Sequence, residues 1–135
     1  MKFLFYIYLV KGKKKMKPIF IENSKVPVAL SKIAPINIWA INLIFFVFCK
    51  GKLNETTKRH ETIHFRQWLE LGIVGFAFLY PVFYLWNRVV KRMPGSTAYY
   101  NIPFEIEAYQ NQDDVDYLES RKLWAWRRTN ENKAS

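Results

Sequence analysis

Residues 54–71 read NETTKRHETIHFRQWLEL, and this stretch decides the fold. It contains no glycine or proline. Asn54 followed by Glu55 is typical of a helix start, because the asparagine caps free amides and the carboxylate suits the positive end of the helix dipole. The sequence therefore predicts one helix from Glu55 to about Leu71. Both histidines of the chain lie inside it, within the motif HETIH at residues 60–64.

The motif HETIH places His60 and His64 four residues apart, so both imidazoles lie on one helical face and can reach one metal ion. Glu61 points to the side, where its carboxylate can hold and deprotonate a water molecule. A zinc ion in a hydrolase usually takes three protein ligands and leaves one position for water. Because the chain has no further histidine, the third ligand is expected to be a carboxylate.

The best source of that carboxylate is the segment NIPFEIEAY at residues 101–109. Pro103 is favoured in the first turn of a helix, and this second helix can pack across the first. Its glutamates, Glu105 and Glu107, lie about 200° apart around a helix, so only one of them can face the metal. Glu105 shares its face with Ala108, whose small side chain lets two helices approach, and is the preferred ligand. Glu107 is the second choice and is otherwise expected to be exposed or paired with a basic residue.

These motifs carry a resemblance to a known group of enzymes. HETIH followed by a helical glutamate resembles the gluzincin metallopeptidases, and NIPFE at residues 101–105 resembles the NxxxE segment of membrane-linked members such as the CAAX-prenyl proteases. Residues 25–128 also look like small bacterial and phage proteins in which HExxH is followed by NPFExEAY. The resemblance implies a minimal zincin-like domain in which Glu105 is the third zinc ligand.

One position departs from the gluzincin pattern. The larger family has an aspartate four residues after the glutamate ligand, and it orients a ligand histidine, whereas this chain has Tyr109. A phenol accepts such a hydrogen bond only weakly, so Asp113 or Asp114 is a candidate substitute. A peptidase also needs a donor that stabilises the oxyanion. The candidates for this donor or for support of the ligands are Tyr99, Tyr100, Tyr109 and Arg66.

The chain before the motif helix predicts a small sheet. Residues 18–35 combine β-branched residues with three prolines and indicate short, irregular strands. Residues 36–49 (INIWAINLIFFVFC) indicate one or two strands that end near Lys50. An edge near residues 43–49 is expected to bind an extended peptide by strand pairing. Together the patterns predict an α+β fold, mostly helical, with a small sheet preceding the HExxH helix.

Residues 71–86 (LGIVGFAFLYPVFYLW) hold no charge and number sixteen, fewer than the roughly 20 that usually span a membrane. Pro81 is expected to kink a helix here. Two interpretations of the apolar helical segment 71–90 are open: a buried partner in a helical hairpin, or a segment in or on a membrane. Trp68 and Trp86 lie near its ends, as interfacial anchors do, and a basic flank follows. The residues of that flank are Arg88, Lys91 and Arg92.

Two further elements are expected beyond the apolar segment. Residues 94–96 (PGS) predict a loop, and a last helix is expected from about Asp114 to Arg127, capped by Asp113 or Asp114. Its expected buried stripe consists of Val115, Leu118, Leu123 and Trp126.

Length and composition are consistent with one domain. The chain has 135 residues and a net charge of +10, but residues 1–15 contribute five lysines and no acid, and no nucleic-acid motif is present. No nucleic acid is therefore expected as a partner, whereas an anionic membrane surface fits the basic balance. The single cysteine, Cys49, excludes an intramolecular disulfide and a cysteine-type zinc site, which favours a cytoplasmic or membrane-associated location.

The chain divides into three expected parts. Residues 1–15 are either a short leader that contacts a membrane or an over-called start before Met16, residues 16–128 form a single metallopeptidase-like domain, and residues 129–135 are a polar tail. The expected function is a zinc metalloendopeptidase that uses Zn²⁺ and Glu61 as general base on a peptide or protein substrate. The alternative is a non-catalytic protein, anchored to a membrane or a partner, with a structural metal site.

Overall fold

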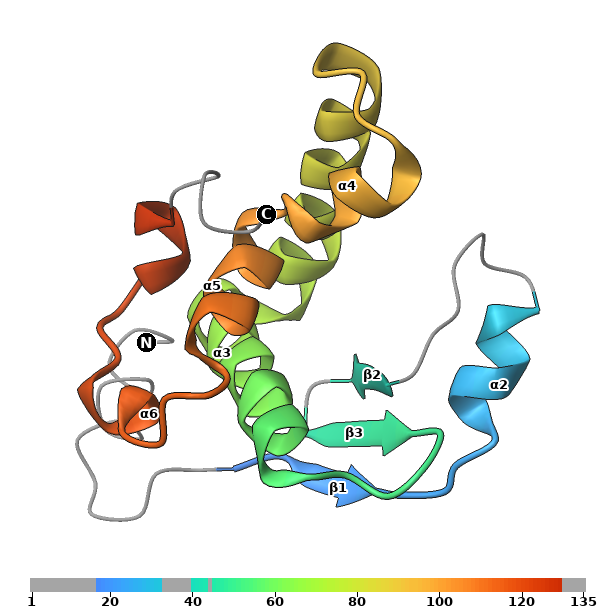
Figure 1. Cartoon of the computed structure of the whole chain (residues 1–135), viewed down its shortest axis with the longest axis vertical. Coiled ribbons are helices and arrows are strands. Elements are labelled where there is room, and N and C mark those ends of the chain that lie inside the picture. The colour runs from blue at the N-terminus through green and yellow to red at the C-terminus, as the bar shows by residue number, and fades with distance from the viewer. Residues whose placement is uncertain (1–16, 33–39, 44, 130–135) are drawn as a thin grey trace.

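The computed structural model describes residues 17–32, 40–43 and 45–129. The expected leader at residues 1–15 and nearly all of the polar tail lie outside these ranges. The fold is α+β and mostly helical, with a small sheet that precedes the HExxH helix, as the sequence predicts. Figure 1 shows the long helix at the centre, with the sheet on one side and the later helices along it.

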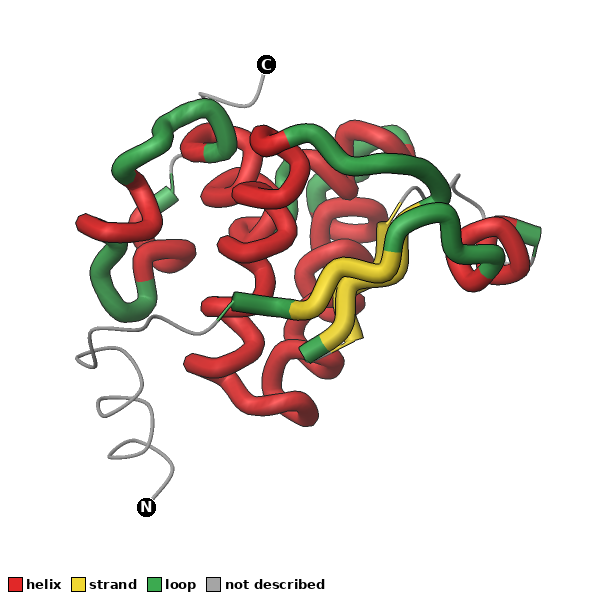
Figure 2. Tube along the Cα trace, turned by 90° about the horizontal axis from the view of Figure 1, so that it is seen from below, coloured by secondary structure: helices red, strands yellow, loops and turns green. Residues whose placement is uncertain are grey.

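The sheet has three strands: β1 (Ile19–Ile21), β2 (Ala40–Leu43) and β3 (Phe46–Cys49). β3 lies in the middle, parallel to β1 and antiparallel to β2. Residues 36–49, where the sequence indicated one or two strands, thus contain β2 and β3. In Figure 2 the strands run side by side between the main helical body and the small helix α2.

The central position of β3 corrects one prediction. An open edge was expected near residues 43–49, but the backbone of β3 is paired on both sides, because β3 lies between β1 and β2. Within the described part of the sheet, the outer strands are β1 and β2. The edge next to the motif helix therefore belongs to β2, which contacts α3.

A helix replaces part of the predicted irregular strands. α2 (Val26–Ser31) begins with Pro27 in its first turn, where the fixed φ of proline suits a helix and its missing N–H leaves no hydrogen bond unmade. Ser31 Oγ donates a hydrogen bond to the Pro27 carbonyl at 2.8 Å. Pro27 thus marks a helix start, whereas the sequence indicated irregular strands here.

The motif helix begins and breaks where the sequence predicts. α3 (Glu55–Leu85) is capped by Asn54, whose Oδ1 accepts a hydrogen bond from Thr57 N at 2.8 Å. Its regular first part ends at Gly72, which has φ 70° and ψ 168°. The kink therefore lies at Gly72, and the prediction of a kink at Pro81 is wrong. The helix continues through Pro81 and ends in a π-helical turn at Trp86–Val90.

Replacing Gly72 by alanine is expected to lower the free energy of unfolding by about 1–3 kcal/mol, because a Cβ at this positive φ strains the backbone although the space around it is open. Urea unfolding followed by circular dichroism measures the change. Gly95→Ala is the matched control: its Cβ would meet only Tyr84 Oη at an ordinary 3.5 Å. Equal stabilities of the two variants would contradict the assignment of strain to Gly72.

Two short helices follow the apolar segment. α4 (Gly95–Tyr100) occupies the place of the expected loop and starts directly after Pro94. α5 (Pro103–Asn111) begins at the predicted proline and packs against α3. Figure 1 shows α4 beside the later part of α3 and α5 beside the motif part.

The predicted last helix is wrong. In its place are two short pieces, α6 (Tyr117–Ser120) and a 3₁₀ turn at Ala125–Arg128, because the chain leaves the helical conformation at Arg121 and adopts a left-handed one at Trp124. The cap is Asp116 rather than Asp113 or Asp114. Of the expected stripe, Trp126 is buried, Leu118 and Leu123 are half-buried and Val115 is exposed.

The main core joins the later part of α3 to α5 and to the C-terminal turn. Phe76 stacks on Phe104 with ring centroids 4.7 Å apart, and Phe104 meets Trp126 edge-on at 4.9 Å. Ile102 completes the buried cluster. A second cluster under the sheet contains Val47, Cys49 and Leu53. Because α5 packs on α3 and on the C-terminal turn through Phe104, its glutamates lie at defined positions beside the motif.

Candidate metal centre

Three side chains from two helices converge on one point. α3 supplies His60 and His64, and α5 supplies Glu105 from its first turn. The two Nε2 atoms lie 3.1 Å apart. The Glu105 carboxylate lies 3.4 Å from His60 Nε2 through Oε2 and 3.3 Å from His64 Nε2 through Oε1. All three residues are buried, and their ligand atoms could hold a metal ion.

The spacing of these atoms matches the coordination shell of a small cation. Tetrahedral ligands at about 2.0–2.1 Å from a zinc ion lie about 3.3 Å from one another. The three observed separations, 3.1, 3.3 and 3.4 Å, are those of one triangular face of such a tetrahedron. The predicted choice of Glu105 over Glu107 agrees with this arrangement.

Two glutamines set the orientation of the histidine rings. His64 Nδ1 lies 2.8 Å from Gln67 Oε1, and His60 Nδ1 lies 3.0 Å from Gln112 Oε1. The Gln67 amide has one possible orientation, because its Nε2 donates to the Phe104 carbonyl at 3.1 Å and to Glu107 Oε2 at 3.0 Å. Nδ1 of His64 therefore carries the proton, and Nε2 points its lone pair toward the shared centre.

The centre requires a positive charge. Glu105 Oε2 is buried and accepts no hydrogen bond from the described residues. Burial alone would raise the pKa of Glu105, but His64 and His60 hold it well below the usual range. Burial alone would lower the pKa of His64, but the Glu105 carboxylate raises it to about 9. A proton or a metal ion thus satisfies this site, and metal binding would displace the proton.

Glu61 lies beside the centre without joining the ligand triangle. It is buried in α3, and burial raises the pKa of its carboxyl, which the nearby His64 and His60 only partly oppose. Glu61 also contributes to the high pKa of Cys49, about 12, although burial is the larger cause. The Cys49 thiol therefore stays protonated and is buried as a small apolar residue.

Tyrosine side chains surround the Glu105 carboxylate. Tyr80 Oη donates a hydrogen bond to Glu105 Oε1 at 2.6 Å. The Tyr109 ring meets the His60 ring edge-on at 4.5 Å, and Tyr100 packs on Tyr109 at 5.2 Å. Burial, followed by the charge of Glu105, raises the pKa of Tyr109 to about 12, so this phenol keeps its proton. Tyr109 thus lies where the sequence places a supporting residue.

The remaining predicted candidates have other positions. Asp113 and Asp114 are exposed, and Asp113 accepts a hydrogen bond from Thr56 Oγ1 at 3.3 Å. The prediction that one of them orients a histidine of the site is therefore wrong. Arg66 is buried within α3. Tyr100 is partly exposed beyond Tyr109.

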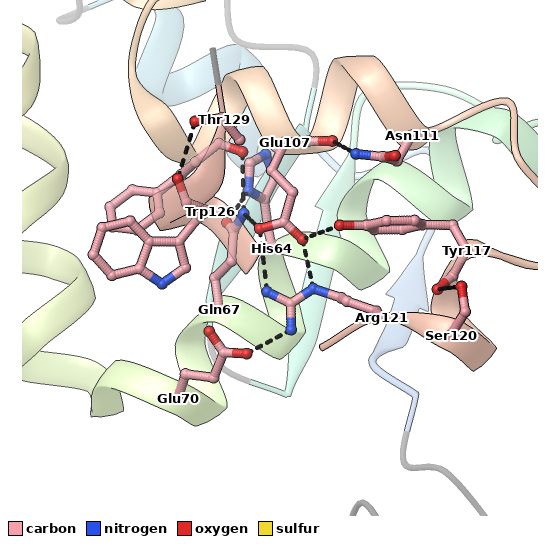
Figure 3. A network of polar contacts seen from close by, with 11 residues as sticks. His64, Gln67, Glu70, Glu107, Asn111, Tyr117, Ser120, Arg121, Trp126 and Thr129 are labelled. Carbon is pink, nitrogen blue, oxygen red and sulfur yellow. Dashed lines mark hydrogen bonds and ion pairs between the residues drawn. The ribbon is translucent and has the colours of Figure 1, made fainter. Parts of the chain in front are cut away.

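Glu107 belongs to a separate buried network, shown in Figure 3. Arg121 contacts both of its oxygens, through Nε at 2.5 Å and Nη2 at 3.1 Å, and Tyr117 Oη donates to Oε1 at 2.9 Å. Arg121 also reaches Glu70 Oε1 at 2.5 Å through Nη1. Glu107 is thus neither a ligand nor exposed. It is paired with a base, which was the other expectation.

The Glu107 network continues to the metal centre through one amide. Arg121 holds Glu107, Glu107 accepts from Gln67 Nε2, and Gln67 Oε1 faces His64 Nδ1. Burial would lower the pKa of Arg121, but Glu107 and Glu70 raise it above its usual range, so its charge is permanent. The arginine therefore anchors the residue that orients a ligand histidine.

Sequence reasoning missed these supporting residues for different reasons. Gln67 lies three residues after His64, and Gln112 lies two turns after Glu105, so helical spacing contained a signal for both. Tyr80 and Arg121 carry no such signal, because each reaches the site through tertiary contacts between separate elements. No family model, curated protein or solved structure matches the chain, so the likeness to gluzincins rests on the two motif segments alone.

Proposed function

We propose that this protein is a zinc-dependent metalloendopeptidase. The observation that carries the proposal is the triangle of His60 Nε2, His64 Nε2 and the Glu105 carboxylate, with separations of 3.1–3.4 Å. Two imidazoles with one carboxylate form a ligand set typical of catalytic zinc, whereas magnesium and calcium prefer oxygen ligands throughout. The fourth position of such a site is left for water.

The residues around the triangle have the chemistry that peptide hydrolysis needs. Zinc, when bound, would polarise the scissile carbonyl and lower the pKa of a water molecule toward about 7. The Glu61 carboxylate would accept a proton from that water as its oxygen attacks the carbonyl carbon, and would then donate this proton to the leaving amine as the C–N bond breaks. The protonated phenol of Tyr109 is the candidate donor to the oxyanion.

The substrate backbone has a candidate binding edge in β2. Among the residues that the structure describes, this strand pairs with β3 alone, and it contacts α3. An extended peptide could add to its outer edge through main-chain hydrogen bonds, which recognise the backbone without demanding a particular side chain. Such pairing suits an endopeptidase, because it requires neither terminus of the substrate.

The burial of the ligands favours a second candidate function, a structural metal clasp between α3 and α5. His60, His64 and Glu105 are each less than a tenth exposed, as in a closed structural site. Such a clasp would bind metal in the same place but would not require Glu61. The two functions therefore differ in whether the protein cleaves peptides and not in whether it binds metal.

Metal analysis of the purified protein tests the centre itself. The wild-type chain is expected to carry one zinc ion, and Glu105→Ala is expected to lose most of it, because two imidazoles remain as ligands. Glu55→Ala removes a carboxylate from the exposed first turn of the same helix and should retain full zinc content. Elemental analysis after dialysis measures both. Stoichiometric zinc in Glu105→Ala would contradict the proposed ligand set.

A further inference from the structure

We infer that the outer face of the helix at residues 73–90 docks on the surface of an anionic lipid bilayer. The inference does not depend on catalysis, because it rests on the opposite side of this helix from the metal centre. Both its support and its test concern binding to lipid alone.

The outer face of this helix is a continuous apolar stripe. Its positions recur every three or four residues, as one side of a helix requires. Val74 is 82% exposed, Phe78 65%, Leu85 57% and Val89 70%. Flanking positions are also exposed, so that the stripe is broad. The stripe consists of Ile73, Val74, Phe78, Val82, Leu85, Trp86, Val89 and Val90.

The inner face of the same helix is packed against the domain. Phe76 stacks on Phe104, and Asn87 Nδ2 donates a hydrogen bond to the Ala98 carbonyl at 3.0 Å. Trp68 is half-buried and stacks on Phe76 against the core, so it is not the interfacial anchor expected from the sequence. Trp86, the other expected anchor, is exposed at the far end of the stripe. The helix therefore packs against protein on one side, and among the described residues its other side is exposed.

Charge identifies the occupant of the stripe. No acidic residue occurs between Glu70 and Glu105, and Arg88, Lys91 and Arg92 are exposed where the stripe ends. A second copy of this helix would bring the same basic groups and no acidic partner from the segment. Anionic lipid headgroups supply the missing negative charge, and the acyl region accepts the apolar side chains, as in amphipathic helices that lie at an interface.

The helix lies on the bilayer and does not cross it. By length and composition alone, the helix from Glu55 to Val90 could span a membrane. However, its uncharged stretch between Glu70 and Arg88 would extend only about 26 Å, less than the roughly 30 Å hydrocarbon core. Its inner face also carries Tyr80, which is bonded to Glu105. Crossing would take the domain core and its metal ligands into lipid.

Flotation of the full chain with phospholipid vesicles tests the apolar stripe. The wild-type chain should float with vesicles of phosphatidylcholine and phosphatidylglycerol, and the variant Val74→Ser/Phe78→Ser should bind them at least about tenfold more weakly. Val115→Ser changes an exposed valine outside the stripe and should bind like the wild type. Repeating the series without residues 1–15 removes any contribution of the basic N-terminal segment.

The same assay tests the charge. Arg88→Gln/Lys91→Gln should bind anionic vesicles roughly 25-fold more weakly, at about a factor of five for each basic residue, and its binding should depend less on salt. Arg127→Gln/Arg128→Gln removes two exposed charges outside the segment and should leave binding unchanged. Zinc content and circular dichroism confirm that each variant is folded.

Two results would overturn the inference. One is equal flotation of the wild type and Val74→Ser/Phe78→Ser in the chain lacking residues 1–15. The other is a dimer in sedimentation analysis that Val74→Ser/Phe78→Ser dissociates while neither protein binds vesicles, because a second copy would then cover the stripe.

Discussion

Replacing Glu61 by glutamine is expected to abolish peptide cleavage while zinc stays bound. The amide has nearly the same size as the carboxylate but cannot accept a proton, so the variant loses the general base and keeps the ligand triangle. General acid–base catalysis typically contributes about 100- to 10,000-fold, and kcat/KM is expected to fall by at least that range. Cleavage of a quenched-fluorescence peptide library, with zinc content measured on the same sample, gives both quantities.

The matched control for this experiment is Glu55→Gln, which makes the same chemical change on the exposed first turn of α3. It should retain both cleavage and zinc. The structural clasp would be favoured if Glu61→Gln left every measured property unchanged while His64→Ala unfolded the domain. Cleavage by the wild type that persists after zinc has been removed by a chelator would contradict the proposed peptidase mechanism.

Replacing Arg121 by methionine is expected to lower the free energy of unfolding by about 3–5 kcal/mol, because removing one partner of a buried ion pair leaves an uncompensated charge. The side chain of Arg121 is 3% exposed, and it faces the carboxylates of Glu107 and Glu70. Methionine keeps much of the side-chain volume, so the loss reports the missing cation rather than a cavity. Urea unfolding of the zinc-free protein measures it without a contribution from bound metal.

A thermodynamic cycle separates charge from packing at this network. Adding Glu70→Gln and Glu107→Gln to Arg121→Met should recover much of the lost stability, because the buried charges are then removed together. Arg127→Met, at an exposed position in the C-terminal turn, should change stability by no more than about 0.5 kcal/mol. A loss below about 1 kcal/mol in Arg121→Met would show that the buried network does not hold α5 in place.

The Arg121 variant also connects stability to the metal centre. Glu107 accepts a hydrogen bond from Gln67, and Gln67 orients His64. When Glu107 loses its arginine, the amide of Gln67 loses a fixed acceptor, and the ring of His64 loses part of its orientation. Outer partners of metal ligands typically contribute 10- to 100-fold to metal affinity, so a weaker zinc site is expected beside the lower stability.

Several features could be read from local sequence because they depend on neighbours within one helix. The start of α3 at Asn54 follows from capping, and its break near Leu71 follows from the glycine. The pairing of His60 with His64 follows from the angle between positions on a helix, and the same angle allows only one of Glu105 and Glu107 to face them. The preference for Glu105 came from the small Ala108 on its face and from the resemblance. These relations span at most a few turns, and tertiary contacts did not alter them.

Other features depend on contacts between distant parts of the chain. The predicted last helix is interrupted at Arg121, whose side chain pairs with Glu107 and Glu70, and no local pattern contains that pairing. β3 is the central strand because it pairs with β1, from much earlier in the chain, as well as with its neighbour β2. The apolar segment buries only the face that meets Phe104. Hydropathy cannot predict which face that is, because both faces of the segment are apolar. Helical periodicity thus predicts which side chains can face one another, whereas the assembly of His60, His64 and Glu105, its charge balance and the exposed stripe arise only when separate elements pack together.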